Sequence, residues 1–246
     1  MADRYFVETP IIGDRATLVA AEAHHLAHVM RAKPGMEMTL FDGGGDEFLA
    51  RVEKVGRAEI VLEVLARNAI DREASLRLTL AVALPKGDRQ RWLIEKAVEL
   101  GVTRFVPLCT ARSVAQPESV ALNRLRRAVI EASKQCGRNR LMQVAEAQTF
   151  AEVLAEPADA RTLAHPGGEP LARLFATGGG LAGPALEPRS MLLAVGPEGG
   201  FTAEEVQQAR ERSWKVVDLG ARILRVETAA LMLAAIVAAR SEPAGH

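Results

Sequence analysis

The sequence predicts an α/β protein in which a small β-rich domain precedes a larger domain built on a mostly parallel sheet. Three observations predict this. The 246-residue chain is longer than a typical single domain. Up to about residue 72, apolar and polar residues alternate with period two. From residue 76 onward, strand-like and helix-like segments alternate instead. We therefore expect two domains, residues 1–72 and 73–246.

The first domain is predicted to be a small antiparallel barrel or sandwich. Residues 42–46 (DGGGD) tolerate positive φ, as a hairpin connection between two strands requires. One short helix is expected at residues 21–31. The predicted strands are residues 4–7, 17–19, 36–41, 47–55 and 59–65.

The second domain is predicted to alternate strand and helix, which implies a parallel sheet covered on both faces. The predicted strands are residues 76–84, 104–109, 142–145, 161–164, 191–195 and 215–219. The predicted helices are residues 89–100, 117–136, 150–155, 171–176, 203–212 and 227–240. Ligands of such sheets bind at the carboxyl ends of the strands, so we expect the site in the loops after residues 164, 195 and 219.

The composition is that of a globular protein, with 48% hydrophobic and 25% charged residues. We expect a cytosolic protein, because no secretory signal is evident and the longest apolar run, residues 229–239, is too short to span a bilayer. Cys109 and Cys136 lack a CxxC pair or neighbouring histidines. Two buried thiols are therefore expected, without a disulfide or a zinc site.

The charge is unevenly distributed although the formal net charge is zero. Residues 86–140 hold twelve basic and five acidic residues. A surface that neutralises RNA phosphates would explain this excess, and a solvated helix face would explain part of it.

Two motifs are weak. Residues 178–183 (GGGLAG) match G-x-G-x-x-G, but they follow a helical segment and run into Pro184, so a dinucleotide site is not expected. His24, His25 and His28 include a pair four residues apart, but no third ligand is evident. We expect no metal.

Residues 196–200 (GPEGG) form the most informative loop. They lie between an apolar strand and a helix in which Thr202 and Glu205 can form a capping box and Phe201 and Val206 a hydrophobic staple. A rigid turn with three glycines exposes backbone groups to a closely approaching ligand. A tight turn without any function would look similar.

Residues 219–229 (LGARILRVETA) place Arg222, Arg225, Glu227 and Thr228 before a helix that is apolar on every face. Such a helix must be buried, so these polar residues need partners at its entrance. Either an internal Arg–Glu pair or a ligand and substrate site would supply them.

Taken together, the motifs resemble the RsmE-type 16S ribosomal RNA uridine N3-methyltransferases of the SPOUT class. The resemblance covers nearly the whole chain and is most specific in residues 196–202 and 219–229. Further matching segments are residues 4–7, 24–31, 86–87, 94–101, 110–114 and 131–138. Residues 137–142 (GRNRLM) depart from the family, which more often has a proline after the basic cluster.

The resemblance implies an amino-terminal PUA-like β-barrel that docks RNA and a SPOUT-type parallel sheet threaded into a trefoil knot. It also implies a homodimer, ribosomal RNA or the small ribosomal subunit as partner, and S-adenosyl-L-methionine as cofactor. By the same likeness, three loops form the cofactor pocket. Their predicted cofactor-binding residues are Leu163, His165, Val195, Gly196, Pro197, Glu198, Gly199, Gly200, Leu219, Gly220, Ile223, Leu224, Arg225, Thr228 and Ala229.

Methyl transfer to uracil N3 requires loss of the N3 proton, so the enzyme must favour the deprotonated base, either with a general base or with positive charge beside the uracil oxygens. Arg225, and secondarily Arg222, are the candidates for that charge, with Glu227 orienting them, whereas Glu198 is expected to be positional. The predicted RNA contacts are Arg4, Arg31, Arg112, Arg138 and Arg140, supported by the basic residues 124–127.

Two other functions remain open at this point. A non-catalytic RNA-binding or ribosome-assembly protein could keep the same fold without needing the cofactor. A nucleotide-dependent metabolic enzyme could use the same loops for a small molecule, although the basic stretch and the β-rich domain argue against it.

Overall fold

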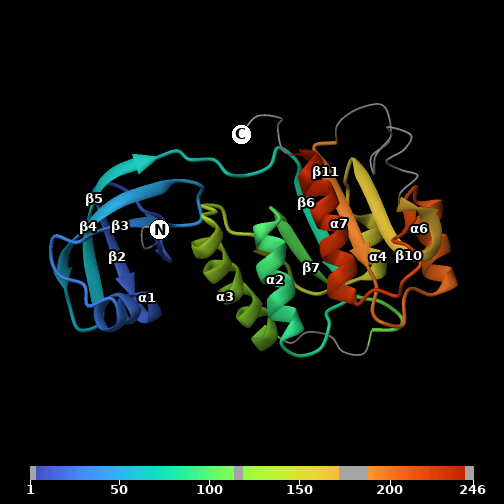
Figure 1. The fold of residues 1–246 in the computed structure, drawn as a ribbon, viewed down its shortest axis with the longest axis horizontal. Helices are drawn as coiled ribbons and strands as arrows, with labels where there is room; N and C mark the ends of the chain where they lie inside the picture. The colour runs from blue at the N-terminus through green and yellow to red at the C-terminus, as the bar shows by residue number, and fades with distance from the viewer. Residues whose placement is uncertain (1–3, 114–118, 172–187, 242–246) are drawn as a thin grey trace. The chain divides into compact units, whose positions relative to one another are not determined.

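A computed structural model describes residues 4–113, 119–171 and 188–241 (Figure 1). The chain divides into two compact units, and each is described here by itself. The first contains residues 1–73 together with residues 130–141, and the second contains residues 74–129 and 142–246. The carboxy-terminal part of one long helix thus belongs with the β-rich unit. The predicted domain boundary between residues 72 and 73 stays a prediction.

The first unit is a five-stranded sheet in the order β1-β3-β4-β5-β2 (Figure 1). Its strands are β1 (Arg4–Phe6), β2 (Arg15–Val19), β3 (Glu37–Phe41), β4 (Glu47–Val55) and β5 (Glu59–Asn68). Alternate residues of these strands are buried, which is the period-two pattern of the sequence. The antiparallel prediction holds for every pair except β1 and β3, which run parallel.

The helix of this unit changes its winding part-way. α1 (Ala20–His24) continues into a π-helical turn, η1 (His25–Val29), closed by a hydrogen bond from Met30 N to His25 O. Arg31 follows with a φ of 54°, a left-handed conformation uncommon for a residue with a side chain. The predicted helix is therefore present, but it ends in a π turn and a reversal of the backbone.

The second unit is a parallel sheet in the order β12-β10-β11-β6-β7-β8, with β9 also paired to β7. Its strands are β6 (Arg77–Val82), β7 (Arg104–Cys109), β8 (Gln143–Val144), β9 (Gln148–Thr149), β10 (Ala160–Pro170), β11 (Ser190–Val195) and β12 (Lys215–Asp218). All the described pairs run parallel, as the strand–helix alternation predicted. The short β9 was not predicted.

Helices cover this sheet. They are α2 (Arg89–Glu99), α3 (Ser119–Cys136), α4 (Phe150–Ala155), α6 (Ala203–Glu211) and α7 (Val226–Ser241). The apolar residues of α4 and α6 join one core with Leu192 and Ala194 of β11, while α7 packs against β6, β11 and α2. The predicted helix at residues 171–176, apart from Leu171, and the GGGLAG motif lie outside the described residues.

The last helix is buried on one face only. Leu233, Ala234 and Val237 of α7 are buried, as expected of an apolar helix. Met232, however, is 36% exposed, and Ile236 is only half-buried. One chain therefore buries one face of α7 and leaves another apolar face open, so burial on every side would need an interface and stays a prediction.

Candidate functional site

The carboxyl ends of three neighbouring strands carry the predicted cofactor segments. β10 lies between β11 and β12, and its residue Ala164 pairs with Val195 on one side and with Val217 on the other. Segments 195–200 and 219–229 lie at or directly after the ends of β11 and β12, whereas segment 163–165 lies within β10, where its pairing register shifts after Ala164. Because the strands are parallel, the fold brings all three segments to the same edge of the sheet.

The turn at residues 196–200 is fixed on both sides. Gly200 N donates to Pro197 O at 2.8 Å, and Gly200 has a φ of 68° with open space where a Cβ would stand. Thr202 and Glu205 form the predicted capping box, with Thr202 N donating to Glu205 Oε2 at 2.8 Å. Both staple residues are buried in one core cluster. The turn is therefore rigid, and open space lies beside the Cα of Gly200.

Segment 219–229 combines exposed arginines with a buried carboxylate. Arg222 and Arg225 are exposed, whereas Glu227 is only 4% exposed. Among the described residues, Glu227 has an ion pair with Arg89, whose Nη1 lies 3.5 Å from Glu227 Oε1, and none with Arg222 or Arg225. The prediction that Glu227 orients these two arginines is therefore corrected, because its carboxylate pairs instead with Arg89, which lies 138 residues earlier in the sequence.

Two further arginines contact the 196–200 turn. Arg112 Nη1 donates to Gly199 O at 2.6 Å, and Arg89 Nη2 lies 3.7 Å from Glu198 Oε1. Arg112 was predicted to contact RNA, whereas Arg89 was counted only among the basic residues. Its single clue in the sequence was its position shortly after a predicted strand that ends at the same sheet edge.

Asp218 joins segment 219–229 to the later part of β10, and sequence reasoning missed it. Its Oδ2 accepts from Gly167 N at 3.0 Å and its Oδ1 from Gly220 N at 2.9 Å. These two N–H groups lower the pKa of the Asp218 carboxyl, which is therefore ionised near neutral pH. An Asx turn after a strand would have been the only local signal.

His165 offers an unused polar atom at this edge. It is half-buried, and its Nδ1 is enclosed without a hydrogen-bond partner in the described structure. Burial lowers the pKa of His165, as do the nearby charges of Arg210 and Arg112, and these outweigh the opposite effect of Asp218. The imidazole is therefore neutral at physiological pH.

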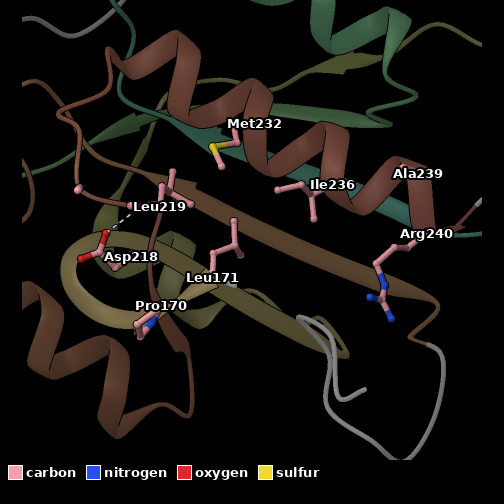
Figure 2. A pocket seen from close by; sticks show the side chains of 10 residues that line it. Pro170, Leu171, Asp218, Leu219, Met232, Ile236, Ala239 and Arg240 are labelled. Carbon is pink, nitrogen blue, oxygen red and sulfur yellow. Dashed lines mark hydrogen bonds between the residues drawn. The ribbon is translucent and has the colours of Figure 1, made fainter. Parts of the chain in front are cut away.

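A cavity of about 760 Å³ adjoins the edge (Figure 2). Its wall is mostly apolar and includes Leu171 and Leu219 opposite Met232 and Ile236 of α7. Of the predicted cofactor residues, Leu219 and Gly220 line it, whereas the 196–200 turn does not. This cavity therefore covers one end of the predicted cofactor site and extends along the open face of α7.

The predicted cofactor residues differ in exposure. Glu198, Gly199, Gly220, Ile223, Arg225 and Thr228 are exposed, His165, Gly200, Leu219 and Leu224 are half-buried, and Leu163, Val195, Gly196, Pro197 and Ala229 are buried. The exposed and half-buried members come from all three segments. The structure thus offers a composite surface, with the buried members supporting it from below.

Comparison with known proteins decides the family. A model of the RNA methyltransferase domain matches residues 72–238, and a model of the RNA methyltransferase PUA domain matches residues 20–65. The chain belongs to the RNA methyltransferase family. The predicted fold class, α/β with an amino-terminal PUA-like domain, is thereby confirmed, while the threading of the chain into a trefoil knot stays a prediction.

Relatives of this methyltransferase match most of the chain. Ribosomal RNA small subunit methyltransferase E of Synechocystis sp. is 36% identical, over 89% of this chain and 71% of that protein. The Bacillus subtilis protein of the same name is 28% identical over 97% of both chains. The structure of the Neisseria gonorrhoeae protein of that name, bound to S-adenosyl methionine, is 31% identical, with a TM-score of 0.82 over 96% of each chain.

The residues at the strand edge fit S-adenosylmethionine, the cofactor of the methyltransferase family. Gly167, Gly200 and Gly220 all have positive φ, and a Cβ at each would meet nothing within 4 Å. Open space therefore lies beside the main chain at these positions, where a ligand can approach closely although the three N–H groups already donate to Asp218 or Pro197. The enclosed Nδ1 of His165 supplies an unsatisfied polar group nearby. Adenine edges and an amino-acid moiety are recognised by such groups.

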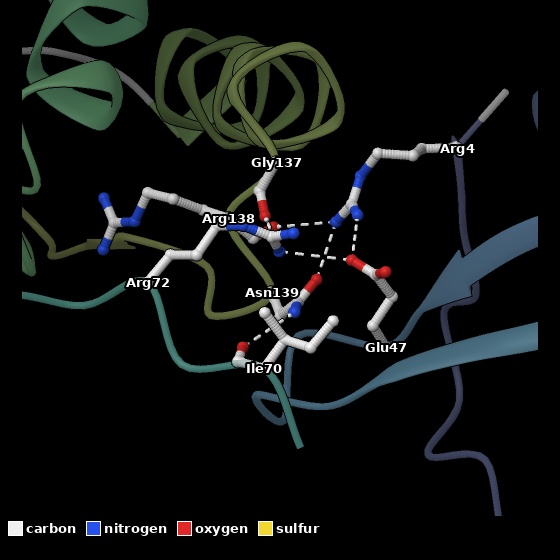
Figure 3. Close-up of polar contacts among 7 residues, drawn as sticks. All are labelled: Arg4, Glu47, Ile70, Arg72, Gly137, Arg138 and Asn139. Carbon is white, nitrogen blue, oxygen red and sulfur yellow. Dashed lines mark hydrogen bonds and ion pairs between the residues drawn. The ribbon is translucent and has the colours of Figure 1, made fainter. Parts of the chain in front are cut away.

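Two of the predicted RNA-contacting arginines of the methyltransferase lie inside the first unit (Figure 3). Arg4 forms an ion pair with Glu47 and donates to Asn139 Oδ1 at 2.6 Å. Arg138 is 5% exposed, and its Nε donates to Glu73 Oε1 at 3.0 Å. Both guanidinium groups are thus engaged by carboxylates, and phosphate contact would require breaking these pairs. Sequence reasoning missed Glu47 and Glu73.

The other three predicted RNA contacts are exposed. Arg31 and Arg140 belong to the first unit and Arg112 to the second. The guanidinium of Arg140 lies where a Cβ on Gly45 would stand, at 2.8 Å, so Gly45 makes room for it. Arg124 and Arg127 of α3 are exposed as well, whereas Arg126 pairs with Glu146. These exposed cations remain the predicted RNA surface.

The remaining expectations concern metals, thiols and membranes. His24 and His28 are exposed with ring centroids 4.5 Å apart, and the described residues contain no group of three metal-ligating side chains.

Cys109 and Cys136 are free but half-buried rather than buried. Burial, and then Glu152, raise the pKa of the Cys109 thiol. Within the described ranges, none of the helices has the length and apolarity needed to cross a membrane.

Proposed function

We propose that this protein transfers a methyl group from S-adenosylmethionine to N3 of a uridine in the RNA of the small ribosomal subunit. The observation that carries the proposal is the shared edge of β10, β11 and β12, where open glycines and exposed arginines meet. The family membership supports the methyl transfer, and the relatives named as small subunit methyltransferases support the choice of RNA.

The cofactor is held by main-chain groups of the three edge segments. Gly200 and Gly220 leave open space beside the main chain, and Asp218 ties β10 to the loop after β12. When bound, S-adenosylmethionine supplies an electrophilic methyl group on a sulfonium. Leu219 and the apolar cavity wall exclude water from one side of the site.

Arg225 is the proposed electrostatic residue for the acceptor base. Uracil N3 carries a proton, which passes to solvent water, and the negative charge left on the base is shared between N3 and its two carbonyl oxygens. Arg225 is exposed and is without an ion pair in the described structure, so its guanidinium is available to stabilise that anion. Arg222 is the second candidate for the same reason. Glu198, exposed on the cofactor turn, is proposed to be positional.

RNA docking is proposed to use the exposed arginines, namely Arg31, Arg112 and Arg140. Arg112 also donates to the carbonyl of Gly199, so an RNA contact at this residue would lie beside the cofactor turn. A splayed base from a single-stranded or loop region is the form of RNA whose N3 such a site can reach.

A second copy of the chain is proposed to cover the open face of α7. Met232 and Ile236 line the apolar cavity on that helix, and Trp92 of the adjoining α2 is 46% exposed. Contiguous apolar surface of this kind is characteristic of an interface.

Because ribosomal RNA is the substrate, we place the enzyme in the cytoplasm.

The experiment uses small ribosomal subunits from a bacterial strain that lacks its own uridine methyltransferase of this family. The purified protein and labelled S-adenosylmethionine are added to subunits and, separately, to protein-free ribosomal RNA, and the modified base is mapped. Label at N3 of a single uridine supports the proposal. Binding to the subunits without label transfer, together with no calorimetric signal for the cofactor, would instead indicate a non-catalytic ribosome-assembly protein.

A further inference from the structure

Arg89 connects two segments of the site that are far apart in the sequence. It is the first residue of α2, which follows the carboxyl end of β6, and β6 pairs with β11 up to Val82 and Val195. This places Arg89 beside the 196–200 turn. Its guanidinium lies 3.7 Å from Glu198 of that turn and 3.5 Å from Glu227 at the start of α7.

The two contacts of Arg89 differ in strength. The side chain of Glu198 is 53% exposed, so water screens this pair and it contributes little. The side chain of Glu227 is 6% exposed, and its second oxygen, Oε2, is enclosed without a partner in the described structure. A buried carboxylate is costly unless it is paired, so Glu227 depends on Arg89.

The position of Arg225 makes this pair relevant to the reaction. Arg225 lies two residues before Glu227, and Ala229 N donates to Arg225 O at 2.9 Å in the first turn at the start of α7. Fixing Glu227 therefore also fixes the backbone that carries Arg225. Arg89 holds this backbone on one side and contacts the cofactor turn on the other.

We infer that Arg89 is a positioning residue that sets the separation between the cofactor turn and the Arg225 backbone. This inference rests on the proposed function, because it assigns the turn to the cofactor and Arg225 to the base. Transfer of a methyl group requires an in-line approach, and a displacement of about 1 Å can slow such a reaction about 100-fold. Arg89 thus acts on turnover through geometry, without touching RNA.

The test compares Arg89→Met and Arg89→Lys with Arg91→Met. Arg91 lies on the same helix, and its Nε donates to Glu95 at 2.7 Å, away from the site. Arg89→Met is expected to lower kcat about 30-fold and to change KM for RNA less than threefold. Arg89→Lys keeps the charge and is expected to recover part of kcat. Arg91→Met is expected to match the parent.

Amide hydrogen exchange on the cofactor-free protein gives a readout besides activity. Arg89→Met is expected to speed exchange in peptides covering residues 196–202 and 219–230, and to leave peptides of β4 and β5 unchanged. If the uncompensated Glu227 unfolds the single variant, the double variant Arg89→Met with Glu227→Gln removes that charge, and its kcat is still expected to be low.

Three outcomes would overturn the inference. Parental kcat and exchange in Arg89→Met would show that Arg89 positions nothing. A raised KM for RNA with unchanged kcat would assign Arg89 to RNA binding instead. Faster exchange across the whole second unit would indicate a general structural role. If the parent itself transfers no methyl group, the proposed function fails, while the exchange experiment still reports whether Arg89 ties the two segments together.

Discussion

Two pairs of arginines, one pair in each compact unit, have opposite surroundings. In the first unit, Arg4 and Arg138 are enclosed and paired with Glu47 and Glu73. In the second unit, Arg222 and Arg225 are exposed and have no carboxylate partner in the described structure. The same residue type thus stabilises the fold in one place and remains available for a ligand in the other. The two roles differ in whether the fold places a carboxylate beside the guanidinium group.

The largest effect expected from this comparison is on stability. Arg138→Ala would leave Glu73 unpaired, and removing one partner of a buried pair costs about 3 kcal/mol of unfolding free energy. Urea denaturation measures it, with Arg140→Ala as the exposed control, which should stay within about 0.5 kcal/mol of the parent. The double variant Arg138→Met with Glu73→Leu should recover much of the loss. Equal stability of the two single variants would remove the distinction between enclosed and exposed arginines.

The next effect is on turnover. Arg225→Ala is expected to lower kcat about 100-fold, because a single group that stabilises developing charge contributes about that much. The melting temperature should not change, since Arg225 is exposed and without an ion pair in the described structure. Label transfer to small subunits measures kcat, and Arg212→Ala, which removes an exposed arginine of the same unit directly after α6, serves as a control. Parental turnover in Arg225→Ala would refute its assignment.

Two aspartates lie at opposite ends of the sheet of the second unit and allow a matched comparison. Asp218 accepts two backbone N–H groups at the carboxyl edge, and Asp159 accepts those of Arg189 and Ser190 where β11 begins. Asp218→Ala is expected to weaken S-adenosylmethionine binding about fivefold, since it removes the hydrogen bonds that tie Gly167 of β10 to Gly220 of segment 219–229. Asp159→Ala should leave binding unchanged. Calorimetry distinguishes them, and equal weakening by both would mean that the effect is general destabilisation.

The smallest effect concerns RNA affinity. Arg140→Ala is expected to weaken RNA binding only a few-fold and to reduce the slope of log affinity against log salt concentration by about one, the loss of one phosphate contact. Binding titrations at several salt concentrations measure the slope. Lys54→Ala, on a strand of the same unit, gives the matched loss of one charge. An unchanged slope in Arg140→Ala would remove Arg140 from the proposed RNA surface.

The features that sequence predicted well are local. The strand and helix order of the second unit follows from apolar periodicity, and the capping box of Thr202 and Glu205 involves residues three apart. The 196–200 turn could be predicted for the same reason. By contrast, Arg89 and Glu227 are 138 residues apart, and Arg4 and Asn139 are 135 apart. Their contacts depend on the sheet order, which the sequence pattern does not specify.

Other differences also have physical reasons. The parallel pairing of β1 with β3 reflects a long-range choice of neighbour that periodicity cannot indicate. Which face of α7 stays open could not be predicted, because an apolar helix in sequence looks alike whether its own chain or a second copy covers it. The burial of Arg138 was missed because its partner, Glu73, lies 65 residues earlier.

Amide hydrogen exchange with and without S-adenosylmethionine tests most directly whether the three segments at the edge of β10, β11 and β12 bind the cofactor together. We expect the cofactor to protect peptides covering residues 163–168, 196–202 and 219–229 and to leave residues 137–141 of the first unit unchanged. Protection confined to residues 137–141, with none at the three strand ends, would contradict it.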